Sequence, residues 1–153
     1  MKPTPPGWPR ASQSIYYRDP KAALDWLARA FGFELRMKVE DDRGTIVHSE
    51  MSYGDALFLV NTAGTTEADK EAWQAQQRSP LDLGGARTQA VCLFVDDVDA
   101  HCATARAAGA KILREPVTND YGDDYWTDRT YGALDPEGHL WWFMTRLRGG
   151  ASK

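Results

Sequence analysis

The two stretches that decide the fold are Ser14-Ile15-Tyr16-Tyr17-Arg18-Asp19 and Val91-Cys92-Leu93-Phe94-Val95-Asp96. Each is an apolar strand pattern that ends at an aspartate, continues into a helical pattern, and reaches Gly32 or Gly109 at 13 residues after that aspartate. A strand, an aspartate, a helix and a glycine that recur at an offset of 77 residues indicate an internal repeat. The alternative, two unrelated strand–helix units that match by chance, stays open at this point.

The residues around each helical pattern support a helix. Asp19-Pro20 places a capping side chain before a proline at the first helical position, and an apolar stripe follows as far as Phe31. Gly32 can adopt the left-handed conformation that ends a helix. In the second copy Asp97 can cap, and a stripe of small residues up to Ala108 predicts close packing of this helix on its sheet.

Three strands are expected after each helix. The predicted strands are residues 34–39, 45–53 and 56–61 in the first copy, and residues 111–114, 129–134 and 139–145 in the second. Gly54-Asp55 is a hairpin-type turn. Asp135-Pro136-Glu137-Gly138 fits a type I turn with proline at its second position.

The expected organisation is one soluble domain. We predict a flexible N-terminal arm (1–11), a domain (12–147) and a tail (148–153). Within the domain, module one (12–61) is joined to module two (88–147) by a linker and lid (62–87). The linker is predicted to carry a short helix over residues 67–77, capped by Thr66, and then a loop over residues 79–85.

Composition narrows the function. A length of 153 residues suits one core, and 42% hydrophobic with 26% charged residues is too mixed for disorder. No apolar run approaches the roughly 20 residues that span a bilayer, and the proline-rich start does not resemble a signal peptide. Two cysteines predict a reduced, cytoplasmic protein. A net charge of −4 without a dense basic stripe argues against nucleic acid as a partner.

Five motifs carry a resemblance to a known family. They are Val95-Asp96-Asp97-Val98-Asp99-Ala100-His101, Arg106-Ala107-Ala108-Gly109-Ala110, Glu115-Pro116, Tyr121-Gly122-Asp123 and Asp135-Pro136-Glu137-Gly138-His139. Together they resemble the vicinal oxygen chelate superfamily, which includes glyoxalase I, ring-cleaving dioxygenases and bleomycin-resistance proteins. The resemblance implies an α+β fold of two βαβββ modules that form a curved, cup-shaped mixed sheet with helices on its outer face. It also implies a homodimer.

The resemblance further implies where metal enzymes of this superfamily place their ligands. The four corresponding positions hold Ser12, Leu59, Ala90 and Trp142. Three of these side chains cannot bind a metal and serine alone is a poor ligand, so we expect no metal and no other cofactor. A register error of one residue does not restore a ligand set.

Histidines offer little alternative. His101 lies within the second helical pattern and His139 follows a turn, so both are expected to be structural or solvated. His48 and Glu50 share a face of one strand and could bind a metal in an unusual place, but two ligands are too few. An exposed polar pair is the expected role of His48 and Glu50.

Seven residues are predicted to bind a ligand from the inner face of the cup. They are Ser14, Tyr16, Leu59, Cys92, Phe94, Trp126 and Trp142. Tyrosines and tryptophans cluster between residues 121 and 142, either as a core and dimer interface or as the wall of a pocket. Carboxylates at Asp120, Asp123, Asp124 and Asp128 would suit a cationic, planar ligand, although a solvated acidic loop fits equally well.

No catalytic residue is predicted, because the sequence lacks a nucleophile elbow, a P-loop and a dinucleotide fingerprint. The leading hypothesis is a metal-independent protein that sequesters a bulky aromatic and possibly cationic small molecule, as drug-resistance members of the superfamily do. The alternative is a metal-independent enzyme, an isomerase or lyase, that uses Tyr16, Ser14 or an aspartate. A metal-dependent glyoxalase or dioxygenase is the third reading.

Overall fold

A computed structural model describes residues 1–64 and 71–149. Module one consists of β1 (Gln13–Tyr17), α1 (Pro20–Phe31), β2 (Glu34–Glu40), β3 (Ile46–Tyr53) and β4 (Ala56–Thr62). Module two consists of β5 (Ala90–Phe94), α2 (Val98–Ala107), β6 (Lys111–Asp120), β7 (Thr127–Leu134) and β8 (Leu140–Arg148). Neither of these helices has the length and hydrophobicity to span a bilayer.

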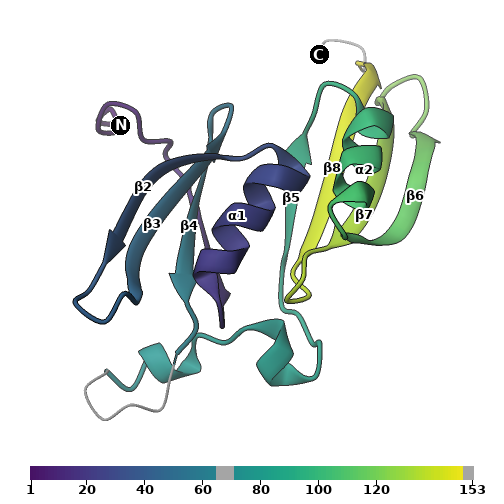
Figure 1. Ribbon diagram of the computed structural model, residues 1–153. Coiled ribbons are helices and arrows are strands. Elements are labelled where there is room, and N and C mark those ends of the chain that lie inside the picture. The colour runs from purple at the N-terminus through teal and green to yellow at the C-terminus, as the bar shows by residue number, and fades with distance from the viewer. Residues whose placement is uncertain (65–70, 150–153) are drawn as a thin grey trace.

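Each module has its own four-stranded mixed sheet, in the orders β1-β4-β3-β2 and β5-β8-β7-β6. In both sheets the first strand pairs parallel with the last, and the remaining pairs are antiparallel. Figure 1 shows the two sheets on opposite sides of the molecule, each open at its edges, with α1 between them. The α+β class and the repeat of two βαβββ modules are therefore confirmed.

Both helices begin where their sequences predict, α1 ends as predicted at Phe31, and α2 ends at Ala107, one residue before its predicted end. The Asp19 carboxylate accepts a hydrogen bond from the Ala22 N–H at 3.0 Å, and Gly32 adopts a left-handed φ of 73°. The Asp97 carboxylate accepts from the N–H groups of Asp99 and Ala100 at the start of α2. The two helices contact each other, so the modules meet through their helical layers.

Strand β6 is longer than predicted. It continues through Pro116 to Asp120, whereas the sequence suggested an end at Arg114. Register shifts on either side of Arg114 interrupt the ladder with β7, and an irregular stretch of this kind accommodates a proline, which has no N–H to donate. Strand β8 likewise extends to Arg148 and removes that residue from the predicted tail.

The segment between the modules differs from its prediction. Residues 67–70 of the expected helix over 67–77, and its cap Thr66, lie outside the described residues. The described remainder of that helix holds only the 3₁₀ turn η1 (Gln74–Gln76). The expected loop over 79–85 contains a second 3₁₀ turn, η2 (Pro80–Leu83). Ser79 and Asp82 form a reciprocal capping box on η2, a signature readable from sequence.

One continuous hydrophobic core is shared by both modules. Trp141 of β8 is fully buried, and its ring centroid lies 5.5 Å from that of Phe33 and 5.7 Å from that of Phe58. Phe31 at the end of α1 likewise packs on Phe143 at 4.7 Å. Because successive residues of a strand point to opposite faces, the other face of each sheet points away from this core.

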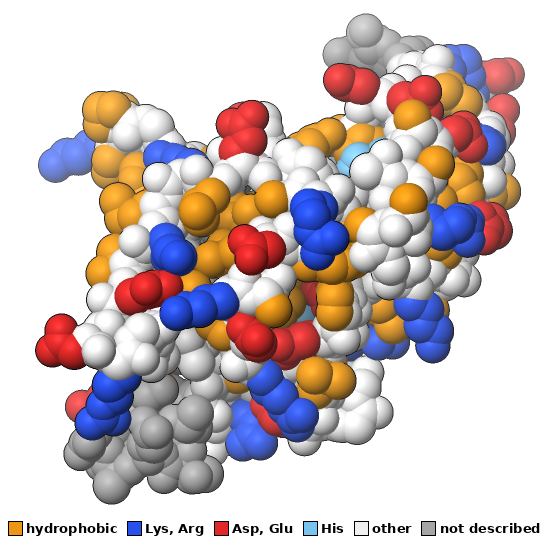
Figure 2. Space-filling view, viewed as in Figure 1, with side chains coloured by type: hydrophobic (Ala, Val, Ile, Leu, Met, Phe, Trp, Pro, Cys, Tyr) orange, Lys and Arg blue, Asp and Glu red, His pale blue; other side chains and the backbone are white. Residues whose placement is uncertain are grey.

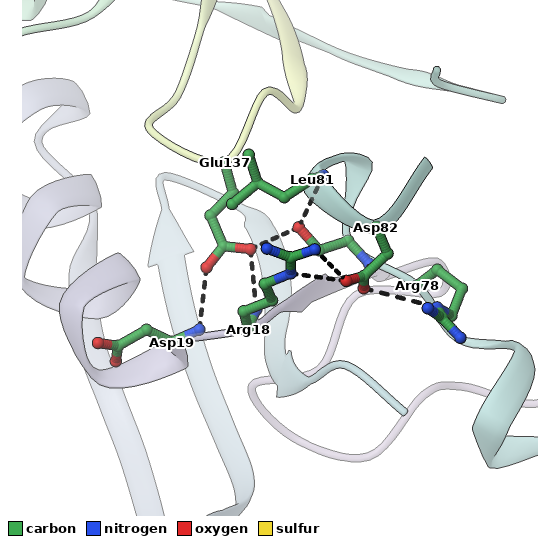
Figure 3. Close-up of polar contacts among 7 residues, drawn as sticks. Arg18, Asp19, Arg78, Leu81, Asp82 and Glu137 are labelled. Atoms are coloured by element: carbon green, nitrogen blue, oxygen red, sulfur yellow. Dashed lines mark hydrogen bonds and ion pairs between the residues drawn. The ribbon is translucent and has the colours of Figure 1, made fainter. Parts of the chain in front are cut away.

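Two buried carboxylates on the β7–β8 turn tie the modules together. Asp135 accepts hydrogen bonds from the Tyr17 hydroxyl at 2.7 Å and from the Trp141 indole N–H at 3.1 Å. Glu137 accepts from the backbone N–H groups of Arg18 and Asp19 at 2.8 and 2.9 Å (Figure 3).

Glu137 and the neighbouring Arg18 also hold the segment between the modules in place. The Ser79 hydroxyl donates to Glu137 at 2.5 Å, and the Arg18 guanidinium donates to Asp82 of η2 at 2.6 Å. Burial raises the pKa of Asp82, but hydrogen bonds from Arg18 and the Ser79 N–H outweigh burial, so that its pKa is lowered overall. Turn β7–β8, β1 and η2 thus meet at one polar junction.

His101 is a structural residue of the core, as its position in the helix predicts. Its Nδ1 lies 2.7 Å from the Tyr131 hydroxyl, and its Nε2 lies 3.2 Å from the Phe31 carbonyl. A neutral ring whose Nδ1 accepts from Tyr131 and whose Nε2–H donates to Phe31 satisfies both contacts. Burial lowers the pKa of His101, although the bond to the Phe31 carbonyl acts in the opposite direction.

Acid should therefore weaken the fold through His101. Below the ordinary histidine pKa of about 6.5 the unfolded chain binds a proton that the folded chain resists, so the free energy of unfolding should fall as pH decreases from about 7 to 5. One such group contributes at most about 1.4 kcal/mol per pH unit. Urea denaturation at stepped pH measures this slope, and His101→Gln should flatten it. An unchanged slope in His101→Gln would contradict the assignment.

Candidate functional site

Four residues form a row across the outward face of module two. Cys92 on β5 pairs with Trp142 on β8, Trp142 pairs with Gly132 on β7, and Gly132 pairs with Arg114 on β6. Directly paired residues share a face of a sheet. Since Trp141 and Phe143 point into the core, this row faces outward.

The Trp142 indole lies directly against the backbone of β7. A β-carbon built on Gly132 would meet Cζ3 of Trp142 at 2.7 Å, which is closer than real carbon atoms approach. Only glycine at position 132 therefore allows the indole to lie flat across the sheet. The ring is partly exposed and forms a fixed apolar surface in the middle of this face.

A cavity of about 390 Å³ opens over this surface. Its apolar lining consists of Cys92, Tyr121, Trp126, Trp142 and Met144. Its polar lining consists of Arg114, Asn119, Asp128 and Thr130. An apolar wall with a few convergent polar groups is the usual composition of a small-molecule site.

Arg146 neutralises the buried carboxylate of this cavity. Its Nε donates to Asp128, which is 4% exposed, and its guanidinium lies 5.0 Å from the ring centroid of Trp126 and 5.3 Å from that of Phe94. Arginine, aspartate and two aromatic rings therefore form one cluster beside Trp142. The predicted residues Phe94 and Trp126 are held in place by this cation–π contact.

Two of the four loop carboxylates are already matched by arginines, which weakens the argument for a cationic ligand. Asp128 is ion-paired with Arg146, and Asp120 is ion-paired with Arg148 at 2.8 Å. The Gly122 N–H and Arg148 together lower the pKa of Asp120. Asp123 and Asp124 are exposed at the tip of the turn and do not line the cavity.

The other three predicted residues lie on the outward face of module one. Ser14 and Tyr16 alternate with the buried residues Ile15 and Tyr17, and Leu59 pairs with Ser14. Tyr16 lines a separate cavity of about 410 Å³ beneath Trp73. Within one chain the seven predicted residues therefore form two groups, and the structure does not bring Tyr16 together with Phe94 or Trp142.

The pair of His48 and Glu50 is less exposed than expected. Glu50 is 4% exposed, and its carboxylate lies 2.9 Å from His48 Nε2 and 3.9 Å from Arg36 Nε. Glu50 is therefore a buried ion-pair partner rather than a solvated side chain. Among residues 1–64 and 71–149 no group of three or more His, Cys, Asp or Glu side chains is placed to hold a metal.

The superfamily's metal positions do not fit a metal here. Leu59 presents a hydrocarbon side chain, Trp142 presents an indole whose nitrogen only donates, and Ala90 has only a methyl group. Ser12 precedes β1 and offers a single hydroxyl. Transition metals need several nitrogen, oxygen or sulfur ligands in fixed geometry, and these four positions do not supply them.

Two arginines of the site were missed by the sequence analysis. Arg146 lies four residues after Trp142 on the same strand, so the two-residue period of a strand would have placed both on one face. Arg114 had no such signal. Its position opposite Gly132 is set by register shifts on both sides of Arg114 in the ladder between β6 and β7, and the sequence does not show these shifts.

The chain is similar to known proteins in both sequence and structure. A profile of the Glyoxalase/Bleomycin resistance protein/Dioxygenase superfamily matches residues 11–143. No curated protein matches the chain. TioX from Micromonospora sp. ML1 shares 32% sequence identity over 89% of this chain and 98% of its own, with a TM-score of 0.65.

Other solved structures share the fold at lower identity. A superfamily member from Sphaerobacter thermophilus is 18% identical over 90% of this chain and 97% of its own, with a TM-score of 0.65. A glyoxalase/bleomycin resistance protein/dioxygenase family enzyme from Burkholderia phytofirmans is 21% identical over 89% and 98% of the two chains, with a TM-score of 0.61. These two likenesses concern the fold alone.

Proposed function

This chain belongs to the Glyoxalase/Bleomycin resistance protein/Dioxygenase superfamily, and from that premise we propose that it is a metal-independent protein that binds and sequesters a bulky aromatic small molecule. Membership alone does not choose among enzymes and binding proteins, because one fold hosts several functions. The observation that carries the proposal is the cavity of module two, in which Trp142 lies flat on Gly132 where a metal enzyme would place a ligand. A fixed indole surface favours a planar ligand.

The surface charges and the cysteines bear on the binding partner and on the cellular compartment. On the face shown in Figure 2, lysine and arginine side chains are interspersed with aspartate and glutamate, which does not favour nucleic acid. Both cysteines are free thiols, which fits a reduced compartment such as the cytoplasm.

Purified protein should contain no stoichiometric nickel, zinc, iron or manganese. The reason is the side chains at Ser12, Leu59, Ala90 and Trp142, which leave the superfamily's metal position without ligands. Elemental analysis of protein purified without chelators measures the content directly. About one transition metal per chain would contradict metal independence and would direct attention to His48 and Glu50.

A homodimer should complete the ligand site. One chain turns its two ligand-facing sheets away from each other, because both bury their opposite faces in the shared core. A second copy can place module one of one protomer over module two of the other and enclose the cavity. Phe94, which is 55% exposed in the single chain, would then be covered. Sedimentation velocity should find a dimer at micromolar concentration, and a monomer would contradict this arrangement.

The proposal of sequestration is tested on protein purified from its own host. Native mass spectrometry should detect an aromatic compound bound to the chain, and denaturation should release that compound chemically unchanged. Incubation of the purified compound with fresh protein should give binding heat without a new product by liquid chromatography. Conversion of the compound at a rate that the protein concentration controls would instead establish the alternative, a metal-independent enzyme.

A further inference from the structure

One positive charge in the wall of the module two cavity is not matched by a carboxylate of that wall. Two charged side chains line the cavity, Arg114 and Asp128, and the Asp128 carboxylate is already ion-paired with Arg146 beside the cavity. Within residues 1–64 and 71–149, Arg114 forms no ion pair. One guanidinium charge at the cavity wall is therefore left without a carboxylate in the described part of the chain.

Neighbouring side chains hold this guanidinium in position. Nη2 of Arg114 donates to the Asn119 side-chain oxygen at 3.0 Å. The amide nitrogen of Asn119 donates in turn to the Thr130 hydroxyl at 3.0 Å, so its oxygen is turned toward Arg114. Asn119 is therefore a positioning residue, and it occupies one donor of Arg114 while leaving other donors of the fork for a ligand.

The strand register brings this cation to the edge of the aromatic surface. Arg114 is directly opposite Gly132, which is directly opposite Trp142, and all three share the outward face. Glycine has no side chain to separate its neighbours, and the Trp142 indole already extends over it. The edge of an aromatic ring system stacked on Trp142, and any substituent on that edge, would therefore lie beside Arg114.

We infer that Arg114 binds a carboxylate of the ligand while the aromatic ring system of that ligand stacks on Trp142. The inference deepens the proposed function, on which it rests, by adding the chemical class of the ligand. A guanidinium presents parallel N–H donors that match the two oxygens of a carboxylate. A cationic ligand would instead meet the Arg114 guanidinium as a like charge.

Three probes that share a naphthalene ring and differ in the charge of a small substituent test the inference by isothermal titration calorimetry at low salt. They are 2-naphthoate, 2-naphthamide and 2-naphthylmethylammonium. We expect naphthoate to bind about tenfold or more tightly than naphthamide, since hydrogen bonds to a charged group exceed neutral ones by that order. The ammonium probe should bind most weakly. Added salt should reduce the advantage of naphthoate over naphthamide.

Substitutions separate the charge from the ring surface. Arg114→Gln should lower naphthoate affinity to that of naphthamide and leave naphthamide unchanged, whereas Arg114→Lys should retain part of the preference. Arg29→Gln, at an exposed position of α1 and outside the module two cavity, removes the same charge and should change neither affinity. Trp142→Ala should weaken both probes alike.

Each remaining result overturns the inference. Equal affinity for naphthoate and naphthamide, with both weakened by Trp142→Ala, would refute the role of Arg114 and leave the aromatic site standing. An unchanged preference in Arg114→Gln would do the same. If the ammonium probe bound most tightly, the result would refute the carboxylate inference and support the hypothesis of a cationic ligand. Failure of all three probes to bind at millimolar concentration would refute the aromatic site itself and the inference with it.

Discussion

Replacement of Asp135 with alanine is expected to lower the free energy of unfolding by about 3–5 kcal/mol. The side chain is 5% exposed and accepts hydrogen bonds from the Tyr17 hydroxyl and the Trp141 indole. It also accepts from the backbone N–H groups of Glu137 and His139 at 3.0 Å each. Truncation leaves these donors buried without an acceptor, and each unsatisfied donor costs about 1–3 kcal/mol.

The pKa of Tyr17 is consistent with this role. Burial raises the pKa of the Tyr17 hydroxyl well above its usual value, and the Asp135 carboxylate raises it further. The hydroxyl therefore keeps its proton at any physiological pH and donates it to Asp135. Within residues 1–64 and 71–149, Asp135 is the one acceptor of this hydroxyl, and loss of the carboxylate removes it.

Urea denaturation followed by circular dichroism measures the effect of Asp135→Ala. For a chain of this length the expected loss corresponds to a fall in melting temperature of about 6–20 °C. Asp135→Asn retains the size and one acceptor oxygen, so it should fall between alanine and the natural residue. Asp25→Ala, on the exposed side of α1, is the matched control and should stay within about 0.5 kcal/mol. A loss below about 1 kcal/mol in Asp135→Ala would refute this account.

Replacement of Trp142 with alanine should weaken binding of 2-naphthamide by about 1–3 kcal/mol, or roughly five- to 150-fold. The indole is the central apolar surface of the cavity, and alanine removes nearly all of that surface. Calorimetry is the suitable measurement, because the variant also loses part of the tryptophan fluorescence.

A second variant keeps the tryptophan but moves it. In Gly132→Ala the added β-carbon would meet the indole at 2.7 Å, so the ring must leave its place against the sheet. This variant should weaken the same probe. Trp8→Ala removes an equally large ring that is 36% exposed and lines neither the module one cavity nor the module two cavity, and it should leave affinity unchanged. Unaltered affinity in Trp142→Ala would refute the proposed site.

Much of the fold was predictable because its signals are local. The Asp19 and Asp97 side chains accept hydrogen bonds from backbone N–H groups in the first turn of the helix that follows each of them. Gly32 ends α1 because its backbone adopts a left-handed conformation. These interactions involve residues within a few positions of one another, so sequence spacing shows them. The alternation of Trp141, Trp142 and Phe143 likewise placed Trp142 on the outward face without knowledge of the partner strands.

The site was less predictable because its residues meet only through tertiary register. Arg114 reaches the edge of Trp142 by way of Gly132, and an irregular stretch of β6 around Pro116 sets that alignment. The neutralisation of Asp128 by Arg146 also depends on pairing between β7 and β8. The sequence showed an acidic loop, whereas only the paired strands show that two of its charges are already matched.

The shared core has a consequence for how this chain can change over generations. Phe33 and Trp141 come from different halves of the duplicated unit yet contact each other, so a volume change in one half must be matched in the other. Residues on the outward faces, such as Cys92 and Arg114, do not pack against the other module, so a volume change there needs no matching change in it. Mutations there can alter what the protein recognises at little cost in stability, which makes this architecture a tolerant starting point for new specificities.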